Sequence, residues 1–332
     1  MNYNCKAGHL PYPKGVCDKC RPPNVVLTRQ VYRHVDYVSF MNYKELGKFV
    51  GFWQRTGYFE QRMGYLYGYY SEDPNYPEGV RCNIEAIYDP PQIGDLNGVQ
   101  ELDDPNKHKV DMIASALGLE RVGHIFTTVE QEVGLTAEQT RRCAMLQQDH
   151  VYDHPQGFKV PKYVSIVARK RGEEMQDVVE FEAYMISDQG MALERDSIFG
   201  NAAEKDKMVV REPGEAEIMP SIVTTGKPVK EFPPDFFLVS LAYGQPADTT
   251  DHSVMKIYEF PVKNREAPAS PAEFSGYMKK YASEPSERMF ANFQLLLYLA
   301  DYMDLDTAIG VAQNIAEESP LDPALIDLFK AM

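Results

Sequence analysis

The first twenty residues carry a metal-binding pattern, C-x3-H-x7-C-x2-C, which limits how this end of the chain can fold. Three thiolates and one imidazole suit a tetrahedral Zn²⁺ with no open coordination position, so such an ion holds a short segment together and performs no chemistry. A C-x2-C pair alone is weak support, because redox motifs share it, but two more ligands at short range favour zinc. The alternatives are free thiols or one disulfide. We therefore predict a structural Zn²⁺ bound by Cys5, His9, Cys17 and Cys20.

Composition is typical of an intracellular globular protein. The 332 residues, 44% of them hydrophobic, suffice for two domains and a small module. Only Cys82 and Cys143 lie beyond the first twenty residues, so no disulfide framework is visible. The chain does not open with a signal-peptide pattern, and its longest apolar stretch, 293–300, is far shorter than the roughly 20 residues of a membrane span. We expect a soluble protein of a reducing compartment, without membrane insertion.

The formal net charge of −15 argues against a nucleic-acid-binding surface over most of the protein. Residues 1–40 are the exception, because they hold six Lys and Arg against two Asp. A basic segment on an acidic body could dock onto an acidic partner. A locally basic loop on an otherwise ordinary surface explains the same charges equally well.

Hydrophobic periodicity predicts a mixed α+β chain. Gly64 and Gly68 inside one predicted strand indicate that another chain segment packs closely against it, and Trp53 and Cys82 are expected in the core. The expected strands are 25–27, 31–38, 63–70, 82–88, 120–127, 163–169, 178–186, 237–241 and 254–260. The expected helices are 43–56, 111–119, 136–148, 272–281, 286–303, 306–317 and 322–331.

A second metal site is a weaker hypothesis. His150 and His154 have the H-x3-H spacing that binds zinc on a helix, but Pro155 follows and the stretch is expected to be a loop. Exposed polar side chains are therefore the favoured interpretation. A second zinc that uses some of Cys143, His150 and His154 stays open.

Several stretches, in one order along the chain, resemble the nuclear protein localization 4 family. The resemblance is specific, because it consists of several long sequence stretches rather than single residues. It covers at least residues 5–130. After the zinc pattern, the matching stretches are RQVYRHVD (29–36), FWQRTG (52–57), GYLYG (64–68), EAIYDPPQIG (85–94), GHIFT (123–127) and, more loosely, MALERD (191–196).

The resemblance implies an α+β fold in three parts. It implies a zinc finger over residues 1–33, an MPN-type domain with insertions over 34–224, and a mixed α/β C-terminal domain over 225–332 that ends in helices. MPN domains are the fold of the JAMM metalloproteases, which cut isopeptide bonds to ubiquitin. A catalytic version needs two His and one Asp on Zn²⁺, a Glu as general base and a Ser that supports the oxyanion.

The JAMM pattern can be laid on this chain, and every reactive group is replaced. The positions of the two His ligands fall on Phe126 and Thr128, the Ser on Thr136, the Asp on Gln139 and the Glu near Gln61. Phe cannot bind zinc, neutral Thr and Gln are poor ligands, and an amide cannot take a proton from water. No H-x-H occurs anywhere in the chain. The resemblance therefore implies a catalytically inactive MPN domain, with no catalytic residues.

The function implied by the resemblance is that of a non-catalytic adaptor. Such an adaptor recruits polyubiquitinated substrates to valosin-containing protein, a hexameric AAA+ unfoldase, together with ubiquitin fusion degradation protein 1. The zinc finger would dock on the unfoldase ring, and the rest would bind ubiquitin, with one unfolded ubiquitin lying in a groove. The expected location is cytoplasm and nucleus, including the cytosolic face of the endoplasmic reticulum, in the ubiquitin–proteasome pathway and endoplasmic-reticulum-associated degradation.

Two other functions stay open at this point. One is a zinc isopeptidase of the JAMM type, disfavoured by the missing ligands. The other is a generic MPN scaffold of another assembly, disfavoured by the finger that precedes the domain. Full members of the family also begin with a ubiquitin-like domain, which this sequence does not contain. Either the chain is a fragment, or it docks through its finger and its partner.

Overall fold

The computed structural model describes Gly15, Cys17 and residues 22–172, 178–215, 217–246, 253–257, 259–265 and 267–331. The chain divides into two compact units. The first unit comprises residues 1–33, 132–161 and 184–240, and the second comprises 34–131, 162–183 and 241–332. The domain boundaries expected from the sequence stay predictions, and each unit is described by itself.

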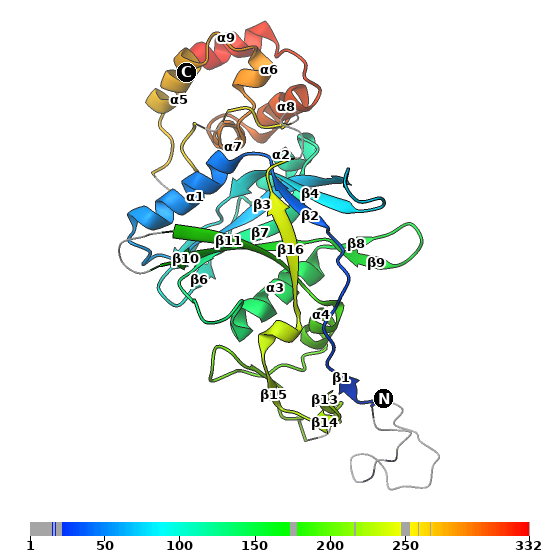
Figure 1. Cartoon of the computed structure of the whole chain (residues 1–332). Helices are drawn as coiled ribbons and strands as arrows, with labels where there is room; N and C mark the ends of the chain where they lie inside the picture. Colours follow the sequence, from blue (N-terminus) through cyan, green and yellow to red (C-terminus); the bar gives the residue numbers. More distant parts are fainter. Residues whose placement is uncertain are drawn as a thin grey trace. The chain divides into compact units, whose positions relative to one another are not determined.

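A closed seven-stranded barrel forms the centre of the second unit (Figure 1). Its strand order is β10-β11-β16-β2-β4-β3-β7. Among the pairs with a described register, β16–β2, β2–β4 and β7–β10 are parallel, whereas β3 is antiparallel to both β4 and β7. A two-stranded antiparallel sheet, β5 (Gln92–Gly94) and β6 (Val99–Glu101), follows β4. The barrel strands are β2 (Tyr37–Phe40), β3 (Met63–Glu72), β4 (Val80–Tyr88), β7 (Glu120–Thr128), β10 (Val164–Arg171), β11 (Val178–Ile186) and β16 (Leu238–Gly244).

The two glycines of β3 have the packing role that the sequence predicts. A Cβ at Gly68 would lie 1.9 Å from the carbonyl oxygen of Asn83, and one at Gly64 would lie 2.6 Å from Ile87 Cγ2. Both partners are on β4, whose pairing with β3 shifts register at Tyr67/Gly68. Glycine is therefore needed at these two positions, where β3 and β4 approach each other closely.

Helix α1 (Tyr43–Arg55) confirms the predicted helix over 43–56. The Asn42 side chain accepts a hydrogen bond from the Lys44 amide and caps the N-terminus, and Gly57, with φ of 66°, lies just past the end. Phe49 and Trp53 on its inner face are fully buried. Each such side chain contributes about 1.5–3 kcal/mol by leaving water, so this face attaches α1 to the unit.

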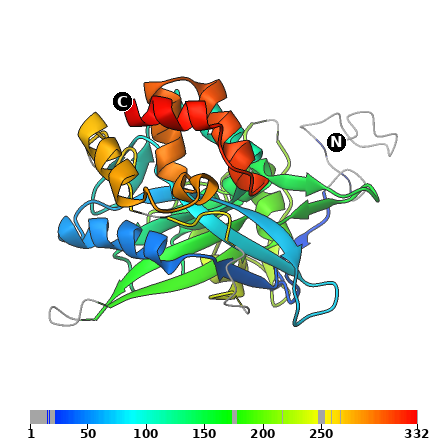
Figure 2. The same ribbon diagram turned by 90° about the horizontal axis from the view of Figure 1, so that it is seen from above.

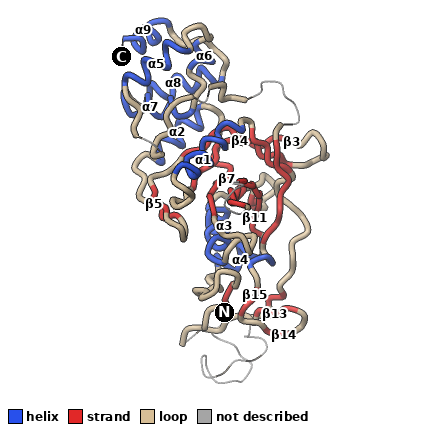
Figure 3. Tube along the Cα trace, turned by 60° about the vertical axis from the view of Figure 1, so that its left-hand side comes forward, coloured by secondary structure: helices blue, strands red, loops and turns tan. Residues whose placement is uncertain are grey.

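Residues 271–331 form a series of helices that belong to the same unit. These helices gather in one group when the molecule is viewed from above (Figure 2), and a trace coloured by secondary structure shows the same group beside α2 (Figure 3). Phe274, Phe290 and Phe329 are buried within it. Besides α2 (Lys107–Ala116), the helices of this group are α5 (Pro271–Lys280), α6 (Ser286–Met289), α7 (Phe293–Tyr302), α8 (Leu305–Ala316) and α9 (Pro323–Ala331).

Three sequence predictions are wrong. The helix expected over 286–303 is two helices, because the Asn292 side chain accepts from the Leu295 amide at 3.1 Å and starts α7 anew. The strand expected over 254–260 is absent from the described residues of that stretch, because several of its amides bind outside any ladder, on the Glu85 carboxylate and the Ala291 carbonyl. The strand expected over 31–38 is present only from Tyr37 onward.

The first unit is built from short sheets and two helices. Gln147 on α3 lies buried and exchanges two hydrogen bonds of 2.8 Å with the backbone of Ile186, so a side-chain amide substitutes for a ladder partner. Phe199, Phe232 and Phe237 form an aromatic core. The elements are β1 (Val25–Val26), α3 (Ala137–Asp149), β8 (Val151–Asp153), β9 (Lys159–Pro161), α4 (Asp188–Arg195), β12 (Met208–Val209), β13 (Ile222–Thr224), β14 (Lys227–Pro228), β15 (Glu231–Phe232) and a 3-10 turn, η1 (Pro234–Phe236).

Within the described ranges, every helix is too short or too polar to span a bilayer.

Candidate functional site

Most of the predicted zinc ligands lie outside the described residues. This holds for Cys5, His9 and Cys20, whereas Cys17 is described and half-buried. His150 ends α3, where its Nδ1 lies 2.8 Å from the Leu146 carbonyl, and His154 lies in the β8–β9 turn, stacked on Phe158. In the part of the chain that the structure describes, no three His, Cys, Asp or Glu side chains form a group that could hold a metal. The four-ligand zinc site stays a prediction.

The structure brings together three of the positions that overlay the metalloprotease pattern, all in the second unit. Met63 pairs with Phe126 across β3 and β7. One residue further along, the Thr127 amide donates to the Arg62 carbonyl and the Arg62 amide donates to Thr127 Oγ1, both at 2.8 Å. Continuing this register places Gln61 opposite Thr128. The overlay positions Gln61, Phe126 and Thr128 therefore lie near one end of the β3–β7 ladder, and the metalloprotease register itself stays a prediction.

Gln61 and Thr128 are both hydrogen-bonded to the backbone of nearby loops. Gln61 is buried, and its Nε2 donates to the Leu96 carbonyl at 2.6 Å. Thr128 is buried as well, and its Oγ1 accepts from the Glu130 amide at 3.1 Å. Both side chains hold the loops that leave this strand end, so they serve the fold.

Arg169, which the sequence analysis did not single out, is a fixed positive charge at the same strand end. It pairs with Thr128 in the parallel β7–β10 register, is fully buried, and donates to the Glu130 carbonyl. Its guanidinium forms an ion pair with Glu182 at 2.9 Å. The ion pair compensates the charge of the buried guanidinium and fixes its position opposite Thr128 in the ladder. The available signal was the run Arg169-Lys170-Arg171, which ends a strand whose first five residues are largely apolar.

The remaining two overlay positions, Thr136 and Gln139, belong to the first unit and cap a helix. Thr136 Oγ1 accepts from the Gln139 amide at 3.2 Å, and Gln139 Oε1 accepts from the Thr136 amide at 3.0 Å. This reciprocal pair is a capping box at the start of α3. The two-residue spacing between Thr136 and Gln139, which falls on the Ser and Asp positions of the metalloprotease pattern, is therefore explained by helix capping.

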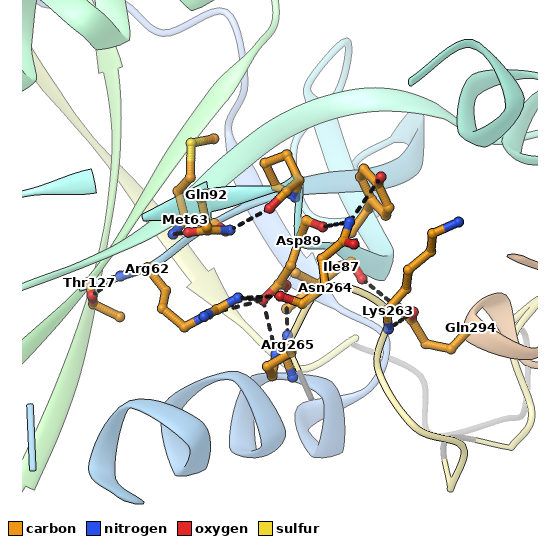
Figure 4. A network of polar contacts seen from close by, with 12 residues as sticks. Arg62, Met63, Ile87, Asp89, Gln92, Thr127, Lys263, Asn264, Arg265 and Gln294 are labelled. Atoms are coloured by element: carbon orange, nitrogen blue, oxygen red, sulfur yellow. Dashed lines mark hydrogen bonds and ion pairs between the residues drawn. The ribbon is translucent and has the colours of Figure 1, made fainter. Parts of the chain in front are cut away.

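A buried ionic centre joins the barrel to the C-terminal segment (Figure 4). Asp89, fully buried after β4, accepts hydrogen bonds from Arg62 at 3.2–3.3 Å and from Arg265 at 2.8–3.0 Å. Asn264 donates to the Asp89 carbonyl at 3.0 Å, and its own carbonyl accepts from Arg62 at 3.1 Å. One carboxylate thus holds two arginines from segments far apart in sequence, and Arg62 directly follows Gln61.

Glu85, four residues before Asp89 on β4, makes a second attachment. Its carboxylate accepts from Ser253 Oγ at 2.5 Å and from the amides of Val254 and Met255 at 3.1 and 3.3 Å. Burial raises the pKa of Glu85, and these three hydrogen bonds oppose that rise. Further along the same strand, the Ile87 carbonyl accepts from Gln294 at 3.0 Å. Strand β4 therefore binds the C-terminal region along its length.

Three exposed apolar side chains, Phe59, Ile93 and Leu96, surround the segment that carries Gln61. Their exposed fractions are 64%, 60% and 50%. The Gln61 amide donates to the Asp95 carbonyl at 3.4 Å, and Gly94 lies so close that a Cβ there would be 1.8 Å from the Gln61 carbonyl oxygen. These contacts hold the β5–β6 hairpin against residue 61. We call Phe59, Ile93 and Leu96 the hairpin patch.

Comparison with known proteins gives consistent matches over nearly the whole chain. A family model described as the NPL4 family matches residues 62–310, and one described as the zinc-binding region of that family matches residues 1–57. Nuclear protein localization protein 4 homologs of Rattus norvegicus and Homo sapiens are each 32% identical over 351 residues, which cover 93% of this chain and 56% of the relative. The homolog of Drosophila melanogaster is 32% identical over 376 residues, covering 100% of this chain and 57% of its own length. The chain thus spans little more than half the length of these relatives.

Proposed function

Because the chain belongs to the NPL4 family, we propose that it is a non-catalytic adaptor that presents polyubiquitinated proteins to the AAA+ unfoldase valosin-containing protein, together with ubiquitin fusion degradation protein 1. The barrel and its flanking helices would be an inactive MPN domain. The observation that supports this most directly is the strand end at Gln61 and Thr128. Under the proposed overlay, an amide and a hydroxyl stand at positions where a zinc hydrolase needs carboxylate and imidazole.

The hairpin patch is our candidate for the ubiquitin-binding surface. Exposed apolar side chains grouped on one hairpin are typical of protein contact sites. An extended chain that lies along a short sheet gains main-chain hydrogen bonds from the strands and apolar contacts from alternate side chains. The patch offers both, because Ile93 belongs to β5 and Leu96 to the turn that follows. We propose that an unfolded ubiquitin segment binds there.

The N-terminal region would supply the contact with the unfoldase ring. A structural Zn²⁺ on Cys5, His9, Cys17 and Cys20 would fix that region, and its excess of Lys and Arg over Asp suits an acidic docking surface. The match of residues 1–57 to the zinc-binding region of the family supports zinc.

The experiment that tests the adaptor role uses the purified 332-residue chain and three readouts, the last of which is co-sedimentation with the unfoldase hexamer, where we expect association. The first is cleavage of di-ubiquitin with and without a chelator, where we expect no product. The second is binding of a fluorescent, unfolded ubiquitin by anisotropy, comparing Ile93→Asp with Leu328→Asp, an exposed leucine on α9 of the same unit. We expect Ile93→Asp to weaken binding about tenfold, which corresponds to about 1.4 kcal/mol, and Leu328→Asp to leave it unchanged.

Sustained cleavage that the chelator abolishes would overturn the non-catalytic role. Equal binding by both variants would show that the ubiquitin-binding surface does not include the hairpin patch. Binding of ubiquitin without any association with the unfoldase hexamer would favour a scaffold of another assembly.

A further inference from the structure

A polypeptide strap runs along the first unit directly after β1 and passes beside the start of α4 (Figure 1). We define the strap as residues 28–33. It follows the predicted zinc ligands in sequence, so whatever holds the strap also restrains the N-terminal region. Before it, β1 pairs in parallel with β13 over only two residues, through bonds of 2.9 Å from the Val25 and Leu27 amides to β13 and its flank.

Two consecutive residues at the start of α4, Asp188 and Gln189, hold the strap, and we call them the clip. Gln189 Nε2 donates to the Val26 carbonyl at 2.8 Å, and its Oε1 accepts from the Thr28 amide at 3.1 Å. The side-chain amide thus continues the β1 ladder as another strand would. The Asp188 amide donates to the Gln30 side chain at 2.8 Å.

The last clip contact is the hydroxyl of Tyr32, which donates to the Asp188 carboxylate at 2.7 Å. This bond raises the pKa of Tyr32, with partial burial and the nearby negative charge adding to it. The clip therefore recognises two main-chain groups and two side chains, spaced along an extended segment.

The strap has little apolar attachment of its own. Leu27 is the last buried side chain before it, whereas Val31 is 94% and Tyr32 is 54% exposed. Arg29 adds one contact, its guanidinium 5.6 Å from the centre of the Phe236 ring. Hydrogen bonds near water contribute little each, and segments with few buried apolar contacts open locally well below the global unfolding free energy.

We propose that the clip and the strap form a releasable tether, which opens to free the N-terminal zinc-binding region while the first unit stays folded. When the strap leaves, the described contacts that remain before it are the two-residue ladder of β1 and the buried Leu27 side chain, and so short a pairing is weak. This inference concerns the chain itself and does not depend on the proposed partners.

Trypsin provides the test, because Arg29 and Arg33 are cleavage sites within the strap. The rate of cleavage of a transiently open segment follows the population of its open form. Gln189→Leu removes both main-chain bonds but leaves the Ser187 cap of α4, whose Oγ accepts from the Gly190 amide. We expect about tenfold faster cleavage at these two sites in the intact chain, measured by mass spectrometry, with an unchanged urea midpoint. Gln156→Leu, at an exposed glutamine of the same unit, should cleave like the wild type.

Amide hydrogen exchange gives a second readout that needs no protease. The Thr28 amide should exchange faster in Gln189→Leu, and the amides of α3 should not change. Equal cleavage of the wild type and both variants would show that the clip does not hold the strap. A drop in the urea midpoint together with faster exchange throughout α3 would show that the clip is part of the core of the unit, and would overturn the tether.

Discussion

At the scale of single residues, the second unit depends on carboxylates that are buried and multiply bonded. Asp89 neutralises Arg62 and Arg265, and the rings of Phe52 and Phe49 on α1 lie 4.5 and 5.4 Å from these two guanidiniums. The sequence could not predict this centre, because Arg265 lies 176 residues from Asp89 and nothing local pairs them. Buried Cys82 and Trp53 were predictable, because neighbouring apolar residues mark them.

Replacement of Asp89 by Asn should lower the free energy of unfolding by about 3–5 kcal/mol, because it leaves two buried guanidiniums without a counter-charge. Urea unfolding of the wild type and of Asp89→Asn measures the difference. Asp327→Asn is the matched control, since Asp327 pairs with Lys330 on the surface and such pairs contribute little. If the two variants unfold alike, the centre contributes nothing special to stability.

Glu45 on α1 should make stability depend on pH. Burial raises its pKa above the ordinary 4.5, Lys48 and Arg265 oppose this, and Asp89 adds to it. The folded state therefore keeps a proton that the unfolded chain has lost, so the free energy of unfolding falls as pH rises from 4.5 through the raised pKa. The Glu45→Gln variant does not lose stability in this way. Its urea midpoint should therefore rise relative to that of the wild type as the pH increases from 4.5 to 7. Glu317→Gln, at the exposed end of α8, should follow the wild type. A constant difference between Glu45→Gln and the wild type would contradict the assignment.

At the scale of elements, sequence patterns predicted correctly the helices and strands whose formation depends on interactions within the element. Helix α1 and strands β3, β4, β7 and β11 occupy nearly the expected ranges, because their apolar periodicity agrees with their burial. The failures occur where a distant polar group captures the backbone. Glu85 takes the amides of Val254 and Met255 away from any strand, and no spacing in the sequence signals that capture. In the same way, the Gln189 side chain binds the Val26 carbonyl and the Thr28 amide, just before the strand that was expected to begin at residue 31.

The capping box of α3 gives an element-scale prediction. Thr136→Ala should lower the free energy of unfolding by about 1 kcal/mol, because it removes the acceptor for the Gln139 amide, while Thr136→Ser keeps that acceptor. Gln139→Glu should retain the box, because Glu suits this position near the positive end of a helix. Hydrogen exchange of the first α3 amides reports the change. Equal loss in the Ala and Ser variants would exclude capping as the cause.

At the scale of the whole molecule, charge is divided unequally between the two units. The first unit holds equal numbers of acidic and basic residues, so the entire formal charge of −15 belongs to the second. Composition predicted an acidic body and a basic N-terminal region, but the assignment to units needed the tertiary contacts. The domains expected over 1–33, 34–224 and 225–332 were continuous in sequence, whereas each compact unit combines three separate segments.

Loss of zinc should affect one region only. Structural zinc supplies about 10–16 kcal/mol in isolated fingers, so Cys17→Ser should abolish zinc binding and unfold roughly the first thirty residues. The barrel should keep its urea transition, because its core is formed by other residues. Metal content and hydrogen exchange of the intact chain measure both effects. A single loss of the whole fold on this substitution would contradict independent folding of the N-terminal region.

The strap also determines how the chain responds to mechanical force. Tension on the N-terminus would load its contacts one after another, first β1 and then Gln189 and Asp188, so each bond breaks alone. The barrel strands are joined by many bonds that share a load, with β3 paired on both sides. A pull from that end would therefore detach the leading segment at low force and leave the closed sheet intact.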